Sequence, residues 1–396
     1  MGKPIRESRG EIYVCKKEIE VLCRQFRKVY KRGTYLDNKK IKVVIFNEAK
    51  GISGIITPWN FPLIIPISKI VQSLLVGNTV VFKPSEVVPV TSIKLTEVIE
   101  DTGLPSGVVN TIIGDRSVGK ILIRSPIDVI SFTGSLEAGE YIIRTYGKNG
   151  KMKKLILELG GNDPFIVLDD ANVELAAKTA VWGRFFNCGQ VCAAPKRFII
   201  HSKVWNDFLE YFLKYVKRIR IGNGLEENTQ MGPLATRQQL LKIQTIVKDA
   251  LRKNARILFG AKKLFKKGYF YAPTVLEDIN LNMEVWRKET FGPVAPLVKF
   301  NKIEECITLA NKSIYGLGAS IWSENEEKAL SLTQKLECGT VWINTVSMIR
   351  PELPWGGTKQ SGIGRELGKR GFIEVGNTKV VMIFRGDKTW LDQYFQ

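Results

Sequence analysis

Short apolar segments that alternate between two periodicities do most to limit how this chain folds. Between residues 41 and 146, segments of strand-like composition take turns with segments whose apolar residues recur at helical spacing. Strands that alternate with helices at this spacing favour a parallel, doubly wound sheet. The strand-like segments are 41–46, 51–57, 79–83, 108–113 and 128–132, and the helix-like ones are 62–75, 91–100, 117–124 and 136–146.

A second alternating series continues toward the C-terminus. It begins with KLILEL (154–159) and ends with VWIN (341–344), and a further strand is predicted at TKVVMIF (378–384). A chain of 396 residues is long enough for two such units, so we expect an α/β protein with two domains. An amphipathic helix is also predicted before the first series, with apolar residues Ile12, Cys15, Ile19, Leu22, Phe26 and Val29 on one face.

The chain contains a single histidine, His201, at the end of a predicted strand. Histidine-rich metal centres and Ser-His-Asp or Cys-His machinery depend on imidazole groups. We interpret His201 as a strand-end residue without a catalytic role, and we predict no metal site. A general base is therefore expected to be Glu, Asp or Lys.

The net charge of +20 raises nucleic acid as a partner. However, the basic residues are spread along the chain and no basic run is interleaved with aromatic residues, so we predict an ion-paired surface and no nucleic-acid partner. Lys, Arg or Gly interrupts every long apolar stretch, so no membrane-spanning segment is predicted. The start, MGKPIRESRGEI, lacks a secretory signal and the six cysteines form no disulfide-like framework, so a cytoplasmic location is expected.

FFNCGQVC (185–192) places two cysteines four residues apart in a turn that follows a helical segment. A structural thiol, a metal ligand and a nucleophile are the alternatives. C-x3-C without a second cysteine pair or a nearby histidine is a poor zinc pattern. Cys192 follows Asn187, Gly189 and Gln190, which suit a tight turn whose backbone N–H groups stabilise a thiolate or an oxyanion. These eight residues alone leave a structural thiol and a nucleophile equally open.

Motifs over nearly the whole chain resemble those of the aldehyde dehydrogenase superfamily. FFNCGQVC matches the F-x-N-x-G-Q-x-C active-site motif, and LELGG (157–161) matches the glutamate motif. ELGGNDPFIVLDDA followed by GQVCAAPKRFII is most similar to the short succinate-semialdehyde-dehydrogenase-like branch. Further matches occur in the family's order at TPWNFP (57–62), FKPSE (82–86), SFTGS (131–135), ETFGPV (289–294) and PWGGTKQSGIGRE (354–366).

This resemblance implies oxidation of a small aldehyde to the carboxylic acid with NAD or NADP as cofactor. Cys192 would attack the carbonyl to give a thiohemiacetal, while the Asn60 amide and the Cys192 backbone N–H hold the oxyanion. Hydride loss to the nicotinamide would leave a thioester, and Glu158 would activate the water that hydrolyses it. Two alternatives stay open: a CoA-acylating semialdehyde dehydrogenase, which usually lacks the deacylating Glu, and a truncated, catalytically silent family member.

No G-x-G-x-x-G fingerprint opens a strand–helix unit, so the cofactor site follows from the resemblance alone. Lys83 and Glu86 would contact the adenosine ribose, and the Glu86 carboxylate would favour NAD over NADP. SFTGS would place pyrophosphate at a helix start, and Glu289 would bind the nicotinamide ribose. The expected cofactor-binding set is Thr57, Pro58, Trp59, Lys83, Glu86, Gly114, Phe132, Thr133, Gly134, Ser135, Leu159, Gly160, Glu289 and Phe291.

The resemblance also implies three parts. An NAD(P)-binding domain would comprise 1–35 and 51–160, a catalytic domain 161–370, and a β oligomerisation arm 36–50 and 371–396. IKVVIF and TKVVMIF would supply exposed strand edges in the arm, so a homo-oligomer, a dimer or a tetramer, is expected. MGKPIRESRGEI lies well inside the family pattern, so we expect an N-terminal segment to be missing and the cofactor domain to be shortened.

The substrate is where this chain departs from the branch that it resembles. Succinate-semialdehyde enzymes tend to hold the distal carboxylate with arginines, and the two expected positions carry Ser68 and Phe186. An anionic substrate therefore loses its clearest support, unless Arg184 takes over this role. Lys288 stands where the family usually has a first Glu, whereas Glu289 keeps the second position.

Overall fold

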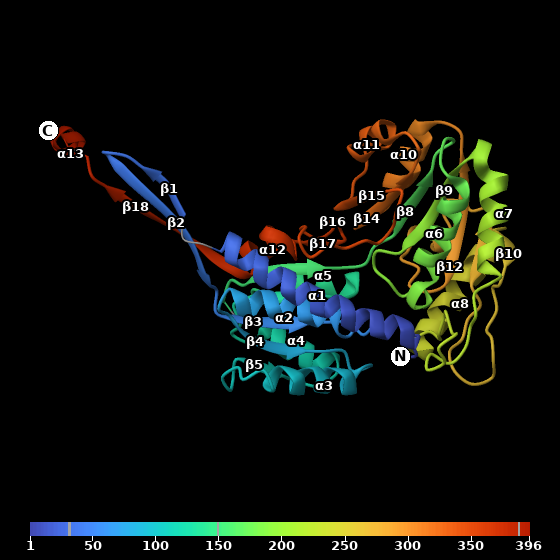
Figure 1. The fold of residues 1–396 in the computed structure, drawn as a ribbon, viewed down its shortest axis with the longest axis horizontal. Helices are drawn as coiled ribbons and strands as arrows, with labels where there is room; N and C mark the ends of the chain where they lie inside the picture. Colours follow the sequence, from blue (N-terminus) through green and yellow to red (C-terminus); the bar gives the residue numbers. More distant parts are fainter. Residues whose placement is uncertain (31–32, 149, 387–388) are drawn as a thin grey trace.

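The computed structural model describes residues 1–30, 33–148, 150–386 and 389–396. The chain forms two sheet-centred bodies and an arm that reaches away from them (Figure 1). The expected α/β class, with a parallel sheet in each body, is confirmed. Within the described ranges, no helix combines the length and the apolarity that a membrane crossing requires.

The first sheet has six strands in the order β17-β7-β6-β3-β4-β5. All neighbours pair in parallel except β17, which is antiparallel to β7. Each predicted strand of the first series lies in or overlaps an observed strand, and only the first, 41–46, belongs to the arm. The six strands are β3 (Ile52–Ile56), β4 (Thr79–Lys83), β5 (Val109–Thr111), β6 (Val129–Thr133), β7 (Lys154–Glu158) and β17 (Gly362–Ile363).

Helices cover both faces of this sheet because successive strand residues point to opposite sides. Ile55 and Phe82 pack toward α2 and α3, whereas Ile130 and Leu157 pack toward α4 and α5. α1 lies outside α2 and α12 and adds Leu22 to the core. The helices are α1 (Ile5–Val29), α2 (Ile64–Leu75), α3 (Pro89–Glu100), α4 (Arg116–Arg124), α5 (Leu136–Thr145) and α12 (Gly368–Val375).

The strand order of the first sheet reverses at β3 and β6. The register places Ile56 beside Lys83 on one side and beside Phe132 on the other, and it places Thr133 beside Glu158. The carboxyl ends of four strands therefore meet at one edge of the sheet. In open α/β sheets, ligands bind at such an edge, where the topology switches direction.

The second sheet has seven strands in the order β10-β11-β12-β9-β8-β14-β15, and only β10 runs antiparallel to its neighbour. All residues of its central strand, β9, are buried, because helices cover both faces. The strands are β8 (Asp163–Val167), β9 (Pro195–His201), β10 (Arg256–Phe259), β11 (Thr274–Glu277), β12 (Val294–Phe300), β14 (Gly318–Trp322) and β15 (Thr340–Ile343).

The helices of the second body divide between its two core clusters. α6, α7 and α8 pack into one cluster, and α10 and α11 pack into the other. His201 ends β9, and its Nδ1 accepts a hydrogen bond from the Lys203 N–H at 3.2 Å. The helices are α6 (Val173–Phe185), α7 (Trp205–Val216), α8 (Arg237–Arg252), α9 (Glu284–Arg287), α10 (Ile303–Asn311) and α11 (Glu326–Thr333); the remaining elements are β13 (Tyr315–Gly316), β16 (Thr358–Lys359) and α13 (Thr389–Tyr394).

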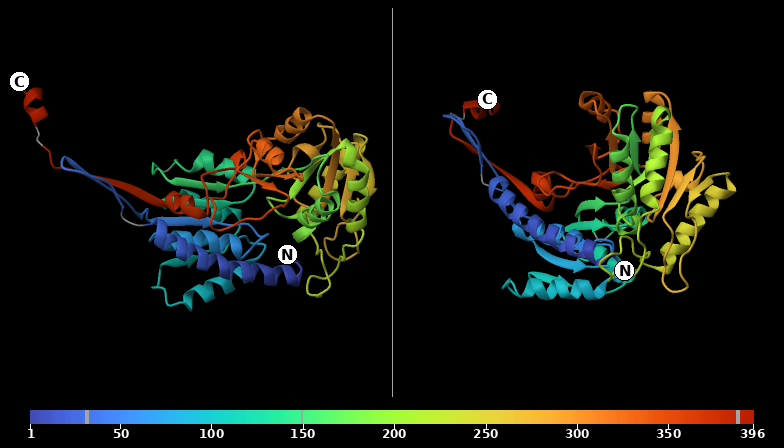
Figure 2. Two further views of the ribbon diagram at one scale, coloured as in Figure 1. Left: turned by 45° about the horizontal axis from the view of Figure 1, so that its top comes forward. Right: turned by 45° about the vertical axis from the view of Figure 1, so that its right-hand side comes forward.

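The arm is a three-stranded antiparallel sheet that stands clear of both bodies (Figures 1 and 2). Its strands are β1 (Gly33–Asp37), β2 (Ile41–Ala49) and β18 (Gly376–Phe384), in the order β1-β2-β18. The expectation that IKVVIF forms an exposed edge is wrong, because β1 and β18 pair with both sides of β2. β18 is an edge strand, and its exposed residues include Val380, Met382 and Phe384.

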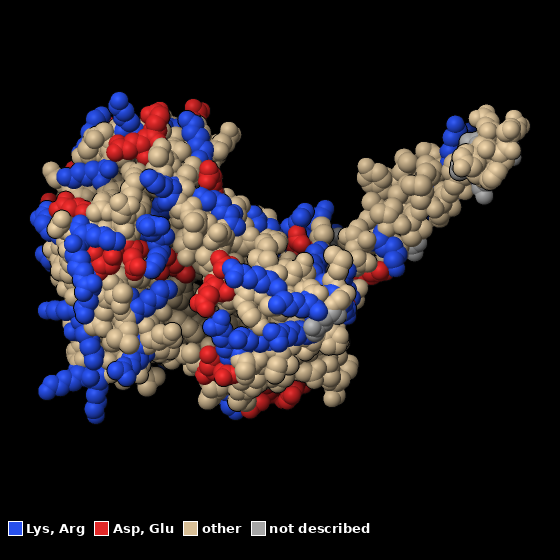
Figure 3. All heavy atoms as spheres, turned by 180° about the vertical axis from the view of Figure 1, so that it is seen from behind, with Lys and Arg blue, Asp and Glu red and all other residues tan. Residues whose placement is uncertain are grey.

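Charge is distributed differently over the body and the arm. Lys and Arg side chains are scattered over the body, whereas most of the arm is uncharged in the view from behind (Figure 3). No single basic stripe follows one element in that view. A scattered distribution of this kind gives a solvated, ion-paired surface, as the sequence predicts for this face.

Candidate active site

The turn after α6 carries both cysteines of the FFNCGQVC motif. α6 ends at Phe185, and a 3-10 turn follows in which Asn187, Cys188 and Gly189 all adopt left-handed backbone, with φ of 50°, 56° and 71°. Left-handed backbone costs a residue other than glycine about 1–2 kcal/mol. Two such residues in succession therefore need support from the surrounding structure.

Arg184 supplies part of this support from inside the protein. Its guanidinium is fully buried and donates to the carbonyls of Gly189 at 2.9 Å, Thr290 at 3.0 Å and Pro195 at 3.0 Å, as well as to that of Gly292. The interpretation of Arg184 as an anion-binding group is therefore wrong, because its bonded nitrogens hold backbone carbonyls and none is exposed. Burial lowers the pKa of Arg184 to about 9.

The two cysteines of the motif differ in access. Cys188 is 1% exposed and packs in the core of the second body, and burial raises the pKa of its thiol well above the ordinary value. Cys192 is only partly buried and lies on the wall of a cavity. This difference favours Cys192 as the reactive thiol, since a nucleophile needs access to its substrate.

The surroundings of Cys192 favour the neutral thiol over the thiolate. Burial raises its pKa to about 12, and the nearby Lys196 ammonium opposes that rise. Lys196 is itself fully buried, donates to the Cys192 carbonyl at 2.5 Å, and lies 3.6 Å from a Glu289 oxygen. The attacking thiolate therefore forms only when its proton is removed and nearby positive charge or N–H donors stabilise it.

Asn60 reaches the same turn from the end of β3. Its Nδ2 donates to the Gln190 carbonyl at 3.0 Å, and the Asn187 amide donates to the Asn60 carbonyl at 2.9 Å. The side chain of Asn60 is buried and lines the cavity with Cys192. An amide fixed beside a reacting carbon is suited to stabilise an oxyanion.

Glu158 lies at the end of β7, behind the cavity rather than on its wall. It is buried, and its Oε1 has no hydrogen-bond partner among the described residues. Burial raises its pKa well above the usual range, Glu366 raises it further, and Lys69 and Arg365 oppose the rise. Lys69 forms a buried ion pair with Glu366 and donates to Ser131 Oγ at 3.2 Å. Glu158 is therefore surrounded by buried charged groups that act on its carboxylate electrostatically.

A cavity of about 190 Å³ opens at the carboxyl edge of the first sheet. Trp59 and Phe291 close it from two sides, with ring centroids 5.6 Å apart and an edge-to-face angle of 82°. α8 contributes Gln239, whose amide donates to the Phe291 carbonyl, and Lys242. The predicted site residues on its wall are Pro58, Trp59, Asn60, Thr133, Gly134, Ser135, Leu159, Gly160, Cys192, Glu289 and Phe291.

The features of this cavity fit a dinucleotide. Ser135 caps α5 by accepting from the Ala138 N–H at 3.3 Å, so the positive end of this helix faces the cavity. A Cβ on Gly160 would lie 2.4 Å from a Glu289 oxygen, so a larger residue there would displace the Glu289 carboxylate. Glu289 lies on the cavity wall, and its Oε1 accepts from the Gly161 N–H at 3.2 Å.

Some predicted residues lie outside the cavity wall. Lys83 is buried, donates to the Pro84 carbonyl at 2.8 Å and lies 3.6 Å from the exposed Glu86 carboxylate, with which it forms an ion pair. Phe132 packs in the core beneath Gly134, and Gly114 packs against Val118. Those off the wall are Thr57, Lys83, Glu86, Gly114, Phe132 and Glu158.

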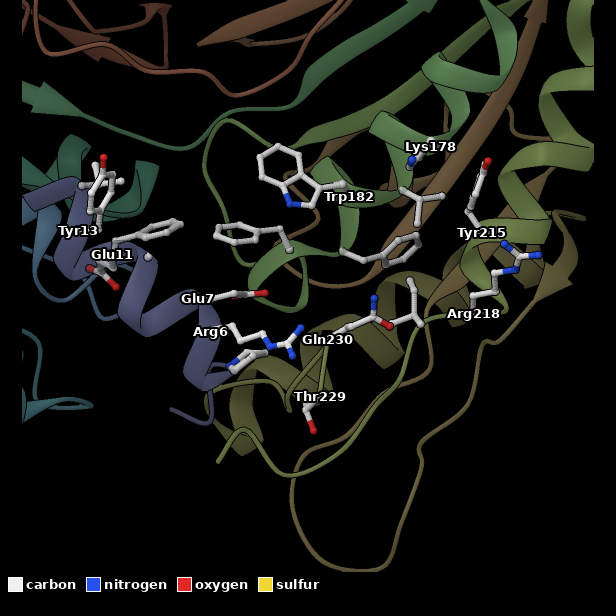
Figure 4. Close-up of a pocket in the computed structure, with 18 of the residues that line it drawn as sticks. Arg6, Glu7, Glu11, Tyr13, Lys178, Trp182, Tyr215, Arg218, Thr229 and Gln230 are labelled. Atoms are coloured by element: carbon white, nitrogen blue, oxygen red, sulfur yellow. The ribbon is translucent and has the colours of Figure 1, made fainter. Parts of the chain in front are cut away.

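A much larger pocket of about 740 Å³ lies beside the nucleophile turn (Figure 4). α1, α6 and α7 form its walls, and the side chains of Trp182, Tyr13 and Tyr215 line it. Phe61 and Phe186, which directly follow Asn60 and directly precede Asn187, stack with ring centroids 6.1 Å apart at its inner end. No sequence motif predicts this pocket, since its lining comes from helix faces far apart in the chain.

The comparison with known proteins agrees with this geometry. The sequence pattern described as the aldehyde dehydrogenase family matches residues 1–381. The betaine aldehyde dehydrogenase of Bacillus subtilis is 40% identical over 350 residues, which cover 87% of this chain and 71% of that protein. The solved structure of an NAD-dependent aldehyde dehydrogenase from Sinorhizobium meliloti has a TM-score of 0.94 and 35% identity, with 98% and 77% of the two chains covered. An NADP-dependent enzyme of E. coli has a TM-score of 0.93 and 33% identity, with 97% and 80% covered.

This chain belongs to the aldehyde dehydrogenase family. The expected enzyme class is thereby confirmed: the chain is an aldehyde dehydrogenase that uses NAD or NADP. The residues missed by sequence analysis around its site are Lys69, Lys196, Gln239, Lys242, Glu366 and Glu7. Two of them lay within quoted motifs: Lys196 in GQVCAAPKRFII and Glu366 in PWGGTKQSGIGRE.

Proposed function

We propose that this enzyme oxidises an aldehyde to the acid through a covalent intermediate on Cys192. The observation that supports the proposal is the position of Cys192, partly exposed on the cavity wall beside Asn60 and opposite Glu289. The thiol proton leaves and a bond forms between Cys192 Sγ and the carbonyl carbon. Asn60 Nδ2 and the Cys192 N–H then hold the oxygen of the thiohemiacetal.

A bound NAD or NADP would supply the oxidant, since its nicotinamide ring takes up a hydride. Glu289 would hold the ribose of this cofactor, and the N-terminus of α5 would hold its pyrophosphate. Glu158, once ionised, takes a proton from the water that attacks the thioester carbon. The carbon–sulfur bond breaks, the acid leaves, and the thiol of Cys192 is restored.

We further propose that the aldehyde reaches Cys192 from the large pocket and that uncharged aldehydes are oxidised at least as well as succinate semialdehyde. Three features support this: Ser68 donates to the Ile64 carbonyl at 2.8 Å and contacts Glu18, Phe186 is aromatic, and Arg184 is fully buried with its two Nη atoms bonded to backbone carbonyls. None of the three offers a carboxylate a cationic partner. Two similar proteins are named for betaine aldehyde and for lactaldehyde, neither of which contains a carboxylate.

A single assay tests the proposal against the two alternatives. NADH or NADPH formation is followed with several aldehydes, with and without CoA. Acid production that is independent of CoA supports hydrolysis through Glu158. A requirement for CoA would identify an acylating enzyme, and the absence of turnover with every aldehyde would identify a silent family member.

We also propose that the arm joins copies of the chain. The exposed edge of β18, with Val380, Met382 and Phe384, presents unpaired backbone and apolar side chains to a partner strand. Light scattering at micromolar concentration should give a dimer or a tetramer, and a stable monomer would contradict this.

All six cysteines are free thiols, which supports a reducing, cytoplasmic location.

A further inference from the structure

The large pocket contains a carboxylate that contacts the nucleophile turn directly. Glu7, in the first turn of α1, accepts a hydrogen bond from the Asn187 N–H, at 3.1 Å to one oxygen and 3.3 Å to the other. Figure 4 shows Glu7 extending from α1 beneath Trp182. No motif includes Glu7, and the catalytic steps derived above do not use it.

Asn187 is a position where such a contact matters. It is the first of the consecutive left-handed residues that precede Cys192, and its N–H points away from the turn toward α1. Other contacts also support the turn: Gln190 Nε2 donates to the Asn187 carbonyl at 3.1 Å, Arg184 holds Gly189, and Asn60 forms hydrogen bonds with both Asn187 and Gln190. Glu7 adds a contact from α1, so it helps Asn60 to fix the turn relative to the first body.

The surroundings of Glu7 shift the pKa of its carboxyl group. Burial raises its pKa to about 7, while the Asn187 N–H and Lys3 lower it and Glu11 raises it. The Cys188 thiol is the titratable group that faces Glu7 from the turn. A buried carboxylate that accepts a backbone N–H makes a stronger hydrogen bond than a neutral acceptor does.

We infer that Glu7 is a positioning residue that holds the left-handed turn so that Cys192 is presented to the substrate. Glu7 acts through the Asn187 backbone, and none of the bond-making steps proposed above uses its carboxylate. The inference rests on the proposed role of Cys192. The left-handed backbone that Glu7 supports is present whether or not Cys192 has that role.

The test measures the reactivity of Cys192 without relying on turnover. Iodoacetamide labels the full-length protein, and mass spectrometry follows alkylation of Cys192 with time. For Glu7→Ala we expect the alkylation rate and kcat each to fall about tenfold, as for loss of one charge-assisted hydrogen bond, while KM for the cofactor stays unchanged. Glu7→Gln keeps an acceptor oxygen and should recover most of the alkylation rate.

Glu20→Gln is the matched control, because Glu20 lies on the same helix, is exposed and pairs only with Lys17. It should behave as the parent protein does. The inference is overturned if Glu7→Ala alkylates at the parent rate, or if Glu7→Gln is as slow as Glu7→Ala while both remain folded by circular dichroism. Should Cys192→Ala retain turnover, the proposed function fails, and the alkylation rates alone still decide the role of Glu7. Should Glu7→Ala not fold, Glu7→Met takes its place, because Met keeps the bulk of Glu but offers no strong acceptor; the same tenfold loss is expected, and the parent rate would overturn the inference.

Discussion

The small cavity and the large pocket, which lie beside the nucleophile turn, are formed by different kinds of sequence. The smaller one, about 190 Å³, lies where β3, β4, β6 and β7 end, and short contiguous motifs supply most of its wall. The larger one, about 740 Å³, lies between faces of α1, α6 and α7. One holds glycines, polar groups and charges at fixed backbone positions, and the other is lined mainly by aromatic and aliphatic side chains.

This difference shows why chemistry is easier to recognise in a sequence than substrate choice. The binding of a hydride acceptor and the placement of a nucleophile need particular backbone geometry, such as the close approach of the Gly160 backbone to the Glu289 carboxylate. An apolar wall needs only bulk, which many residues provide. The nucleophile turn separates the small cavity from the large pocket. A substitution in that turn should therefore affect both sites, whereas a substitution in the wall of one site should affect that site alone.

The largest effect is expected at the turn itself. Cys192→Ala should abolish aldehyde oxidation and leave the fold intact, because Cys192 is partly exposed and its loss leaves only a small gap at the cavity. Cys188→Ala is the matched control, since Cys188 is buried in the core; it should lower the melting temperature and retain activity. Steady-state rates and thermal unfolding of both variants test this, and an active Cys192→Ala beside an inactive Cys188→Ala would reverse the assignment.

A smaller loss is expected behind the turn. Glu158→Gln should slow thioester hydrolysis by a factor of about 100 to 10,000, the usual value of a general base. Rapid mixing should show a burst of NADH followed by a slow steady rate. Because burial raises the pKa of Glu158 and only its ionised form is a base, hydrolysis by the parent enzyme should rise with pH through a midpoint well above the ordinary 4.5. Rapid, burst-free turnover by Glu158→Gln would falsify the role.

Substrate preference tests whether the large pocket favours uncharged aldehydes. Because Ser68 and Phe186 stand where the arginine clamp is expected, a distal carboxylate should lose about ten- to a hundredfold in kcat/KM relative to an enzyme that has the clamp. We therefore expect pentanal and benzaldehyde to equal or exceed succinate semialdehyde when all three are measured in one buffer. A hundredfold preference for succinate semialdehyde would mean that a cation other than Arg184 serves the pocket.

The fold and the small cavity were largely predictable because both follow from local sequence. The strand–helix alternation predicted the parallel sheets, and the motifs at strand ends predicted most of the cavity wall. Arg184 shows where prediction fails: a cation near a substrate position became a buried support for carbonyls that are distant in sequence. The prediction for β2 failed in a similar way, because the alternating pattern of a strand does not reveal whether one or two strands pair with it. Gln239 and Lys242 were missed because the approach of α8 depends on tertiary packing.

The smallest and most selective effects should come from paired variants on the two sides of the turn. Gln239→Ala removes the side chain that holds the Phe291 carbonyl, so KM for the cofactor should rise about threefold to tenfold, as for one lost hydrogen bond. Trp182→Ala removes a ring that is 53% exposed and lies 5.4 Å from that of Phe186, so KM for benzaldehyde should rise by about the same factor through lost apolar contact.

Each variant of this pair serves as the control for the other. Gln239→Ala should leave KM for benzaldehyde unchanged, and Trp182→Ala should leave KM for the cofactor unchanged, because the turn and its left-handed backbone lie between the two sites. If both variants raise both constants, the two sites are coupled through the turn and the proposed separation of substrate and cofactor is wrong. If Trp182→Ala changes neither constant, the aldehyde does not approach through the larger pocket, and only the smaller cavity remains as its route to Cys192.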